Sequence, residues 1–194
     1  MLEGAFGIKG GKLKKFLIGF FILFLAAILY AQEKASEPKG NICYTESVEV
    51  EKGTSFPVKI FVNNVDTLAG MQVPIYYRSE KVDLKCDSIS FNGSRCSEFA
   101  LNLPLIEPVG KTAFFAFISM TDPEEEHPPL FPGDGMVATF WFTAPKDVKS
   151  GKVELSSGPN AIYPHDKIDY SYLFWTPAAE QVECTYKPGF ITVK

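Results

Sequence analysis

The side chains that could carry catalysis are few in this sequence. His127 and His165 are its only two histidines. Neither lies in an H-E-x-x-H pattern, which would bind zinc, and no G-x-S-x-G pattern supplies a serine nucleophile. Two carboxylates close in space can hydrolyse glycosides, but we do not expect a substrate cleft of the kind that longer chains form. The sequence therefore predicts a protein that is not an enzyme.

Acidic residues are concentrated in the segment DPEEEHPPLFPGDG, at positions 122–135. Its carboxylates are Asp122, Glu124, Glu125, Glu126 and Asp134. A calcium site would need several oxygen ligands that converge from one tight loop. The prolines favour an extended chain instead, so we predict a solvated acidic loop. No cofactor is predicted, and calcium bound at this segment is the alternative.

Four cysteines are present, and they favour two disulfides if the chain is exported to an oxidising compartment. Three connectivities are open. Cys86 and Cys96 flank the run DSISFNGSR, and closing this small loop is the least demanding option. That pairing leaves Cys43 and Cys184, near the two ends of the domain. Zinc is the competing interpretation, but no C-x-x-C spacing supports it.

The first 31 residues have the layout of an export signal. Lysines precede an uncharged apolar run, Phe16–Tyr30, and Ala31 could precede a cleavage point. As a helix this run would reach roughly 23 Å, short of the ~30 Å hydrocarbon core of a membrane. We predict a signal peptide over 1–31, with a retained hydrophobic helix that anchors the chain as the alternative. A polar linker follows at 32–40, and the protein is expected outside the cell or on its surface.

The rest of the chain has the composition of an all-β domain. Its 17 phenylalanines and 8 tyrosines suit half-buried sheet surfaces, and its 14 prolines punctuate turns. The formal net charge is −4, with no basic block outside the N-terminus. Nucleic acid is therefore not expected as a partner, because binding to phosphates needs clustered lysine and arginine.

Short segments with period-two patterning lie between turn signals from residue 41 onward. They span residues 46–53, 55–64, 69–77, 82–91, 111–120, 136–144, 151–157 and 189–194. In 69–77, Met71, Val73, Ile75 and Tyr77 share one face of a strand. Pro74 lies on the other face and cannot donate a hydrogen bond, which predicts a gap or an edge there. About nine such strands predict a two-sheet antiparallel β-sandwich with jelly-roll topology.

The order of these signals resembles the cohesin family. VEVEKG resembles its opening strand, and FPVKIFVNNVDTLAGMQVPIYY resembles the strand, Asn-containing turn and strand that follow. GDGMVATFWFTA and GFITVK resemble a later strand and the closing strand, so the likeness covers about residues 41–194. The resemblance implies a nine-stranded jelly roll whose first and last strands lie side by side, which would bring Cys43 near Cys184. It also implies a role in assembling extracellular protein complexes or in polysaccharide breakdown.

One candidate docking surface follows from the segment 69–78. Gln72, Tyr76 and Arg78 could form part of a protein-docking face on one sheet, and the alternative is an ordinary solvated face. Gln72 is the nearest counterpart of the aspartate with which cellulosomal cohesins meet dockerin. Tyr77 is followed by Arg78 and Ser79, where that branch often carries Tyr-Asp-Pro.

Exposed aromatic residues are the other candidates for binding. Trp141 lies between two threonines on the more polar face of its strand, where an indole could hold a partner or a sugar ring. Tyr172 and Trp175 belong to the aromatic-rich segment 162–175, which could stack on sugars. The alternatives are a tryptophan covered by a loop and a loop that packs its own aromatic residues.

These observations favour a non-catalytic binding module. Its expected partner is a dockerin-like protein, or a polysaccharide held directly by exposed aromatic residues. A purely structural cell-surface domain is the third hypothesis. Contact with a membrane is expected only through the N-terminal segment.

Overall fold

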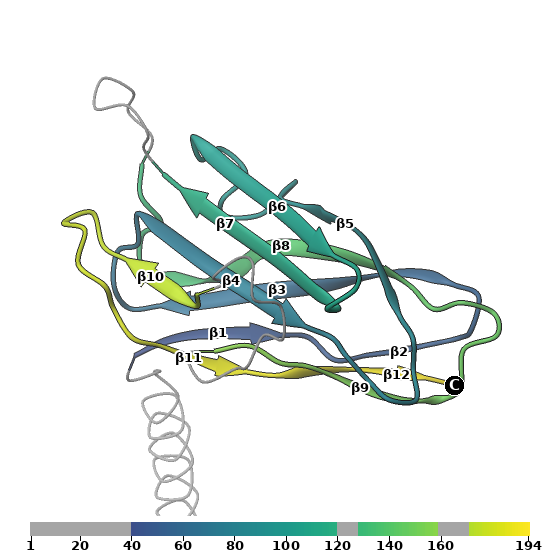
Figure 1. The fold of residues 1–194 in the computed structure, drawn as a ribbon. Helices are drawn as coiled ribbons and strands as arrows, with labels where there is room; N and C mark the ends of the chain where they lie inside the picture. Colours follow the sequence, from purple (N-terminus) through teal and green to yellow (C-terminus); the bar gives the residue numbers. More distant parts are fainter. Residues whose placement is uncertain (1–39, 120–127, 159–170) are drawn as a thin grey trace, which may run out of the picture. The chain divides into compact units, whose positions relative to one another are not determined.

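The structure is a computed structural model that describes residues 40–119, 128–158 and 171–194. All regular elements in these ranges are β-strands (Figure 1). They are β1 Asn41–Thr45, β2 Val48–Val50, β3 Ser55–Asn64, β4 Gly70–Tyr76, β5 Lys85–Ser90, β6 Leu101–Glu107, β7 Thr112–Ile118, β8 Gly133–Thr143, β9 Gly151–Leu155, β10 Leu173–Trp175, β11 Cys184–Lys187 and β12 Gly189–Val193. The predicted leader, nearly all of the linker, both histidines and the carboxylates at 122–126 lie outside the described residues.

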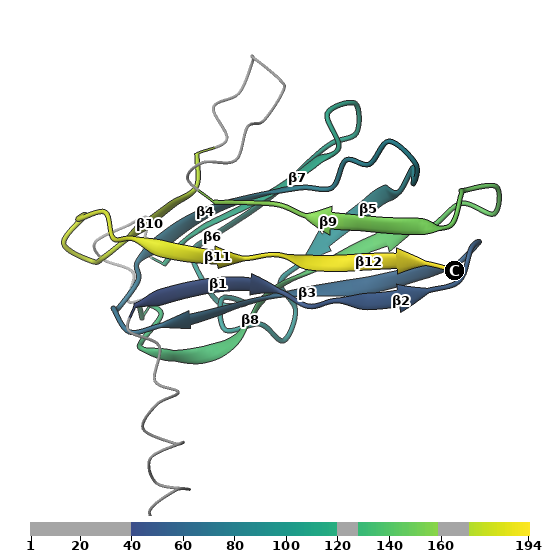
Figure 2. The ribbon, with the colours of Figure 1, turned by 90° about the horizontal axis from the view of Figure 1, so that it is seen from below.

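The strands form two sheets that face each other, with a small extension (Figures 1 and 2). One sheet has five strands in the order β11-β1-β3-β8-β5, and the other has four in the order β10-β4-β7-β6. Three further strands, in the order β2-β12-β9, continue one end. All pairings are antiparallel except β1 with β11 and β2 with β12. The predicted all-β sandwich is confirmed, and the jelly-roll description of its connections stays a prediction.

Alternate residues of the two sheets meet in one continuous core. Met71, Val73 and Ile75 of β4 are fully buried, as the period-two pattern predicts. They share the core with aromatic residues from both sheets, and the rings of Phe115 on β7 and Phe140 on β8 meet edge to face at 5.9 Å. Burial of large aromatic side chains is the main favourable term for a sandwich of this size.

The described residues form twelve strands where about nine were predicted, and two pairs of them follow each other with only a short break. β1 and β2 follow each other along one edge and are separated only by Glu46 and Ser47. β11 and β12 are separated only by Pro188, which has no N–H to donate. The strands that lie outside every predicted segment are β1, β6, β10 and β11.

The predicted gap at Pro74 is present. β10 pairs with β4 only from Gly70 to Gln72, so Pro74 lies beyond the end of β10 and no ladder N–H is needed on that side. On its other side Pro74 is opposite Phe114 of β7. The carbonyl of Pro74 accepts a hydrogen bond from the Ser157 hydroxyl at 2.5 Å.

The predicted disulfide between Cys86 and Cys96 is wrong, because both thiols are free. Cys86 lies opposite Phe142 of β8, whereas the N–H of Arg95, next to Cys96, donates to the carbonyl of Met136. Six residues of an extended strand separate these two points of β8, which is about 20 Å. The short spacing in sequence is therefore stretched out along a strand.

The predicted pair Cys43–Cys184 is also wrong, although its strands are neighbours as the family resemblance implied. Cys184 lies opposite Asn41, and Cys43 lies opposite Tyr186. An offset of two residues between parallel strands separates the two Cα atoms by about 8 Å, beyond the limit of about 7 Å for a disulfide. Both thiols are free. Because none of the four cysteines forms a disulfide, they no longer support export to an oxidising compartment. The expectation of export now depends on residues 1–31 alone.

All four thiols are expected to be unreactive in the folded chain. Burial raises the pKa of Cys86 and of Cys96 to about 12 and that of Cys184 to about 11, and raises the pKa of Cys43 well above its ordinary value. The thiolate is the reactive form. Without reductant, the reagent DTNB at pH 8 should label none of the four in native protein and all four in guanidinium. Absence of labelling in guanidinium would indicate disulfides after all.

Within the described parts of the chain, no helix is long and apolar enough to cross a membrane.

Candidate docking face

The outer face of the four-stranded sheet is built in rows, because paired strands place opposite residues on the same side. The first row runs Trp175, Gly70, Ile118, Leu101, and the second runs Leu173, Gln72, Ala116, Leu103. The third row holds Pro74, Phe114 and Leu105. We call these three rows the docking face. A fourth row, Tyr76, Thr112 and Glu107, closes the sheet at its far end.

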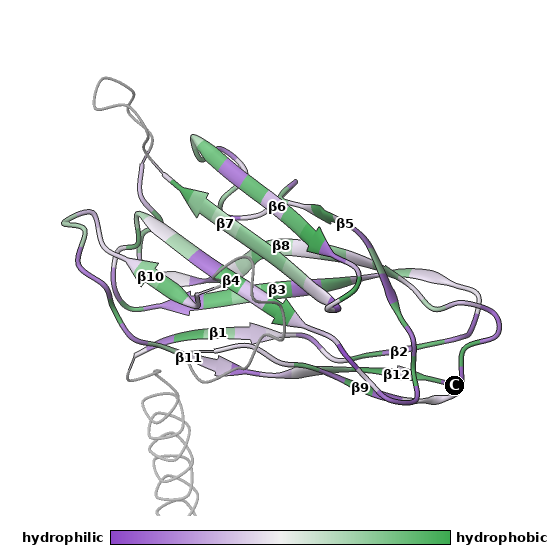
Figure 3. Cartoon of the chain, in the orientation of Figure 1, coloured by the Kyte–Doolittle hydropathy of each residue, from purple (hydrophilic) through white to green (hydrophobic). Residues whose placement is uncertain are grey.

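Apolar side chains dominate the docking face and remain partly open to solvent. Leu101, Leu103, Leu105 and Ile118 have exposed fractions of 40%, 47%, 37% and 42%. Between them, Phe114 and Ala116 form a small cluster of their own, separate from the core of the sandwich. Strands β6, β7 and β10 accordingly show mostly hydrophobic colours in Figure 3. Contiguous apolar surface of this kind on a soluble domain usually marks an interaction site.

The docking face carries no charged side chain in its three rows, and its hydrogen-bonding side chains are the Gln72 amide and the indole N–H of Trp175. Glu107 lies in the fourth row, and its carboxylate is used within the chain. It accepts hydrogen bonds from the backbone N–H groups of Val109, at 3.0 Å, and of Gly110. The turn between β6 and β7 is thereby held, and the docking face stays uncharged.

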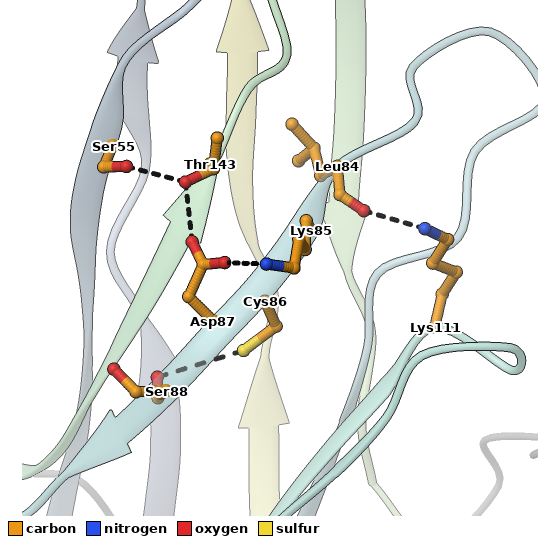
Figure 4. A network of polar contacts seen from close by, with 8 residues as sticks. All are labelled: Ser55, Leu84, Lys85, Cys86, Asp87, Ser88, Lys111 and Thr143. Carbon is orange, nitrogen blue, oxygen red and sulfur yellow. Dashed lines mark hydrogen bonds and ion pairs between the residues drawn. The ribbon is translucent and has the colours of Figure 1, made fainter.

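The outer face of the five-stranded sheet is polar by contrast (Figure 4). Lys85 on β5 forms an ion pair with Asp87 at 2.8 Å, and the Thr143 hydroxyl donates to the same carboxylate at 2.6 Å. Thr143 also lies 2.6 Å from the Ser55 hydroxyl. The hydrogen bonds from Lys85 and Thr143 lower the pKa of Asp87 below its ordinary value. The polar side chains of Lys85, Asp87, Thr143 and Ser55 therefore bind one another on this face.

Solved structures that share this arrangement are cohesins at low sequence identity. The third ScaC cohesin of Acetivibrio cellulolyticus, solved with a ScaB dockerin, has a TM-score of 0.62 at 16% identity, over 79% of this chain and 98% of that one. The OlpC cohesin of Clostridium thermocellum, solved with Doc435, has a TM-score of 0.61 at 13% identity, over 82% and 96%. A non-cellulosomal cohesin of the archaeon Archaeoglobus fulgidus has a TM-score of 0.57 at 12% identity, over 80% and 91%.

This chain has a cohesin-like fold. The resemblance of the sequence to the cohesin family is thus confirmed at the level of the fold. No protein-family model matches the sequence, and no curated protein is significantly similar to it.

The cohesin-like domain brings three of the predicted binding residues together. Gln72 and Trp175 are half-buried in adjacent rows of the docking face, and Tyr76, also half-buried, lies in the fourth row. Arg78 is exposed beyond the end of β4 and belongs to none of the rows.

The other two predicted residues lie elsewhere in the cohesin-like domain. Trp141 is on the outer face of the five-stranded sheet, between Pro57 on β3 and Ser88 on β5, with an exposed fraction of 41%. Tyr172 is buried, so it offers no open ring for a ligand. Its hydroxyl has no partner in regular hydrogen-bond geometry and faces the thiols of Cys43 and Cys184; burial is the main reason that its pKa is raised.

The docking face depends mostly on residues that the sequence reading missed. Leu101, Leu103 and Leu105 alternate with Asn102 and Pro104 over the first five residues of β6, which is the pattern of a strand with one apolar face. That alternation was the available signal. Pro104 weakens it, but proline is tolerated on an edge strand, and β6 pairs only with β7.

No group of three or more His, Cys, Asp or Glu side chains converges on a metal-sized site in residues 40–119, 128–158 and 171–194. Asp134, the last carboxylate of the predicted acidic loop, lies on β8 and accepts a hydrogen bond from the Tyr44 hydroxyl at 3.0 Å. Burial and this bond raise the pKa of Tyr44 to about 12.

Proposed function

We propose that this chain is a non-catalytic assembly module that binds a dockerin-like protein through the docking face. One observation carries the proposal: an open, uncharged, apolar sheet face in a domain with a cohesin-like fold. Protein interfaces typically combine such an apolar centre with a polar rim. Two of the similar structures are cohesins in complex with dockerins, which supports a protein partner.

The proposal is tested by measuring binding to dockerin domains directly. The full chain is immobilised and exposed to recombinant Doc435, the ScaB dockerin and every dockerin-like domain encoded in the source genome. We expect at least one to bind with a Kd in the micromolar range or tighter, because an interface near 800 Å² per partner commonly supports such affinities.

Sedimentation of the chain alone tests whether a second copy of this chain, rather than a dockerin, occupies the docking face. If no dockerin binds and the chain is a dimer that a charge on the docking face dissociates, the face is a self-association surface and the proposal fails. If no dockerin binds and the chain is monomeric, the proposal fails as well.

Direct binding to polysaccharide is the second candidate function, and the position of Trp141 favours it. The indole is open on the outer face of the five-stranded sheet, between Pro57 and Ser88. Exposed indoles bind sugar rings by stacking. If the chain is retained on microcrystalline cellulose or chitin, Trp141→Ala should abolish retention, whereas Phe131→Ala, which removes another exposed ring, should not. Equal retention of both variants would argue against this function.

We further propose that the domain works outside the cell or on its surface, supported by the export-like pattern of residues 1–31. Cell fractionation with mass analysis of the N-terminus tests this. Secreted protein that starts after Ala31 indicates a signal peptide, and membrane-bound protein that retains Met1 indicates an anchor. Full-length protein in the cytosol would contradict both.

A further inference from the structure

A hollow of about 420 Å³ opens at the first row of the docking face. Its lining includes Gly70 of the central strand β4, Trp175 of β10, Ile118 of β7, Pro129 and Pro177. The lining is completed by the loop residues Ala69, Ser119, Pro129, Thr176, Pro177 and Ala179. The hollow therefore lies where the first row of the docking face, at Trp175, Gly70 and Ile118, meets the loops that flank β4, β7 and β10.

The position of Trp175 depends on this glycine. A Cβ atom at residue 70 would lie 3.2 Å from Cε3 of the Trp175 indole and 3.2 Å from the carbonyl oxygen of Phe117. The indole edge thus covers the Cα atom of Gly70, as aromatic residues cover glycines in other sheets. The Trp175 backbone is also fixed, since its carbonyl accepts the N–H of Ala69 at 2.8 Å. The wall of the hollow is held before any partner arrives.

The chemistry of the lining selects the occupant. Among the residues that the structure describes, no charged side chain lines the hollow, and the hydroxyl-bearing ones are Ser119 and Thr176. Ser119 is itself buried, with an exposed fraction of 2%. A charged side chain would lose its hydration here without gaining an opposite charge. A sugar would leave most of its hydroxyls unpaired, because specific sites for polar ligands need several convergent polar groups.

We propose that the hollow at Gly70 receives one large uncharged apolar side chain, of the leucine or phenylalanine class, projecting from the protein that docks on this face. This assignment rests on the proposed function, because Gly70, Ile118 and Trp175 belong both to the docking face and to the lining of the hollow. Buried apolar anchors of this kind carry a disproportionate share of the affinity of an interface.

The two tryptophans allow the hollow to be tested without a known partner. In Trp141→Phe, Trp175 is the sole indole and reports on the hollow; in Trp175→Phe, Trp141 reports on the opposite sheet. Cyclohexanol serves as the apolar probe and N-acetyl-lysine amide as the charged one. We expect cyclohexanol to shift the emission of Trp141→Phe to shorter wavelength in a saturable manner, because it displaces water from the indole. The charged probe should cause no shift.

Variants separate occupation of the hollow from general effects. Trp175→Phe should show no saturable shift with cyclohexanol, and adding Ile118→Asp to Trp141→Phe should weaken cyclohexanol binding by about tenfold or more. Ile118 has an exposed fraction of 42%, so the sandwich should tolerate this change, and circular dichroism checks it. The inference is overturned if Trp141→Phe shows no saturable shift up to the solubility of cyclohexanol, or if both tryptophans respond alike.

These outcomes are independent of the dockerin measurements. Dockerin binding without an occupied hollow would retain the proposed function and remove the apolar anchor. Occupation by cyclohexanol without any dockerin ligand would retain the hollow as an apolar site and remove the proposed partner.

Discussion

Replacing Leu103 by aspartate is expected to weaken dockerin binding by about a hundredfold or more. Leu103 lies in the middle row of the docking face, and its exposed fraction of 47% means that the free domain tolerates a polar side chain there. In a complex, the new carboxylate would be buried against an apolar surface with no positive group of this face to pair with it. An unpaired buried charge typically costs several kcal/mol, and the ratio of Kd values from biolayer interferometry measures the loss.

Val65→Asp is the matched control for this substitution. Val65 is also apolar and has an exposed fraction of 46%, but it lies in the turn between β3 and β4, outside the docking face. The Val65→Asp variant should bind dockerin as the unchanged chain does.

Because the docking face is uncharged, the affinity for dockerin should also change little as NaCl rises from about 50 to about 500 mM. Similar losses in both variants, or a steep dependence on salt, would place the interface elsewhere.

Replacing Gly189 by alanine is expected to destabilise the domain by about 3 kcal/mol or more, or to prevent folding. Gly189 begins β12 where the last strand passes the break between β1 and β2. Its N–H donates to the Thr45 hydroxyl at 2.8 Å, and an added Cβ atom would lie 2.6 Å from the Thr45 carbonyl oxygen and closer still to that of Glu46. Both obstacles are backbone atoms, which cannot move aside as a flexible side chain can. Guanidinium unfolding followed by circular dichroism measures the change.

Gly40→Ala controls for the loss of a glycine as such. An added Cβ atom at residue 40 meets nothing within 4 Å, and this residue precedes β1. Its free energy of unfolding should stay within about 0.5 kcal/mol of the unchanged chain. If Gly189→Ala lowers the free energy of unfolding by less than about 1 kcal/mol, β12 can move away from the break between β1 and β2 at little cost. The close approach at Gly189 would then not be important for stability.

The local sequence pattern was enough to predict the strands whose inner faces are apolar. In β4, the alternation of Met71, Val73 and Ile75 predicted the buried face correctly, because successive side chains of a strand point to opposite sides whatever the strand pairs with. The gap at Pro74 was likewise a local consequence, since a residue without an N–H cannot take part in a full ladder.

Strand pairing and register determined features that the local sequence pattern could not predict. Cys43 and Cys184 were expected to bond because their strands are neighbours, which is true, yet a register offset of two residues keeps their thiols apart. The leucines of β6 alternate as core residues do, but β6 is an edge strand whose leucines lie on the outer face.

By itself the sequence determined that this chain is an all-β domain, because alternation and turn residues act within a few positions of each other, and its motifs resembled those of the cohesin family. Only the tertiary structure decided that leucines of β6, a glycine of β4 and a tryptophan of β10 form one uncharged face with a hollow. Their juxtaposition depends on hydrogen-bond register between segments up to about a hundred residues apart, and long-range register is set by the packing of the whole core rather than by any short stretch.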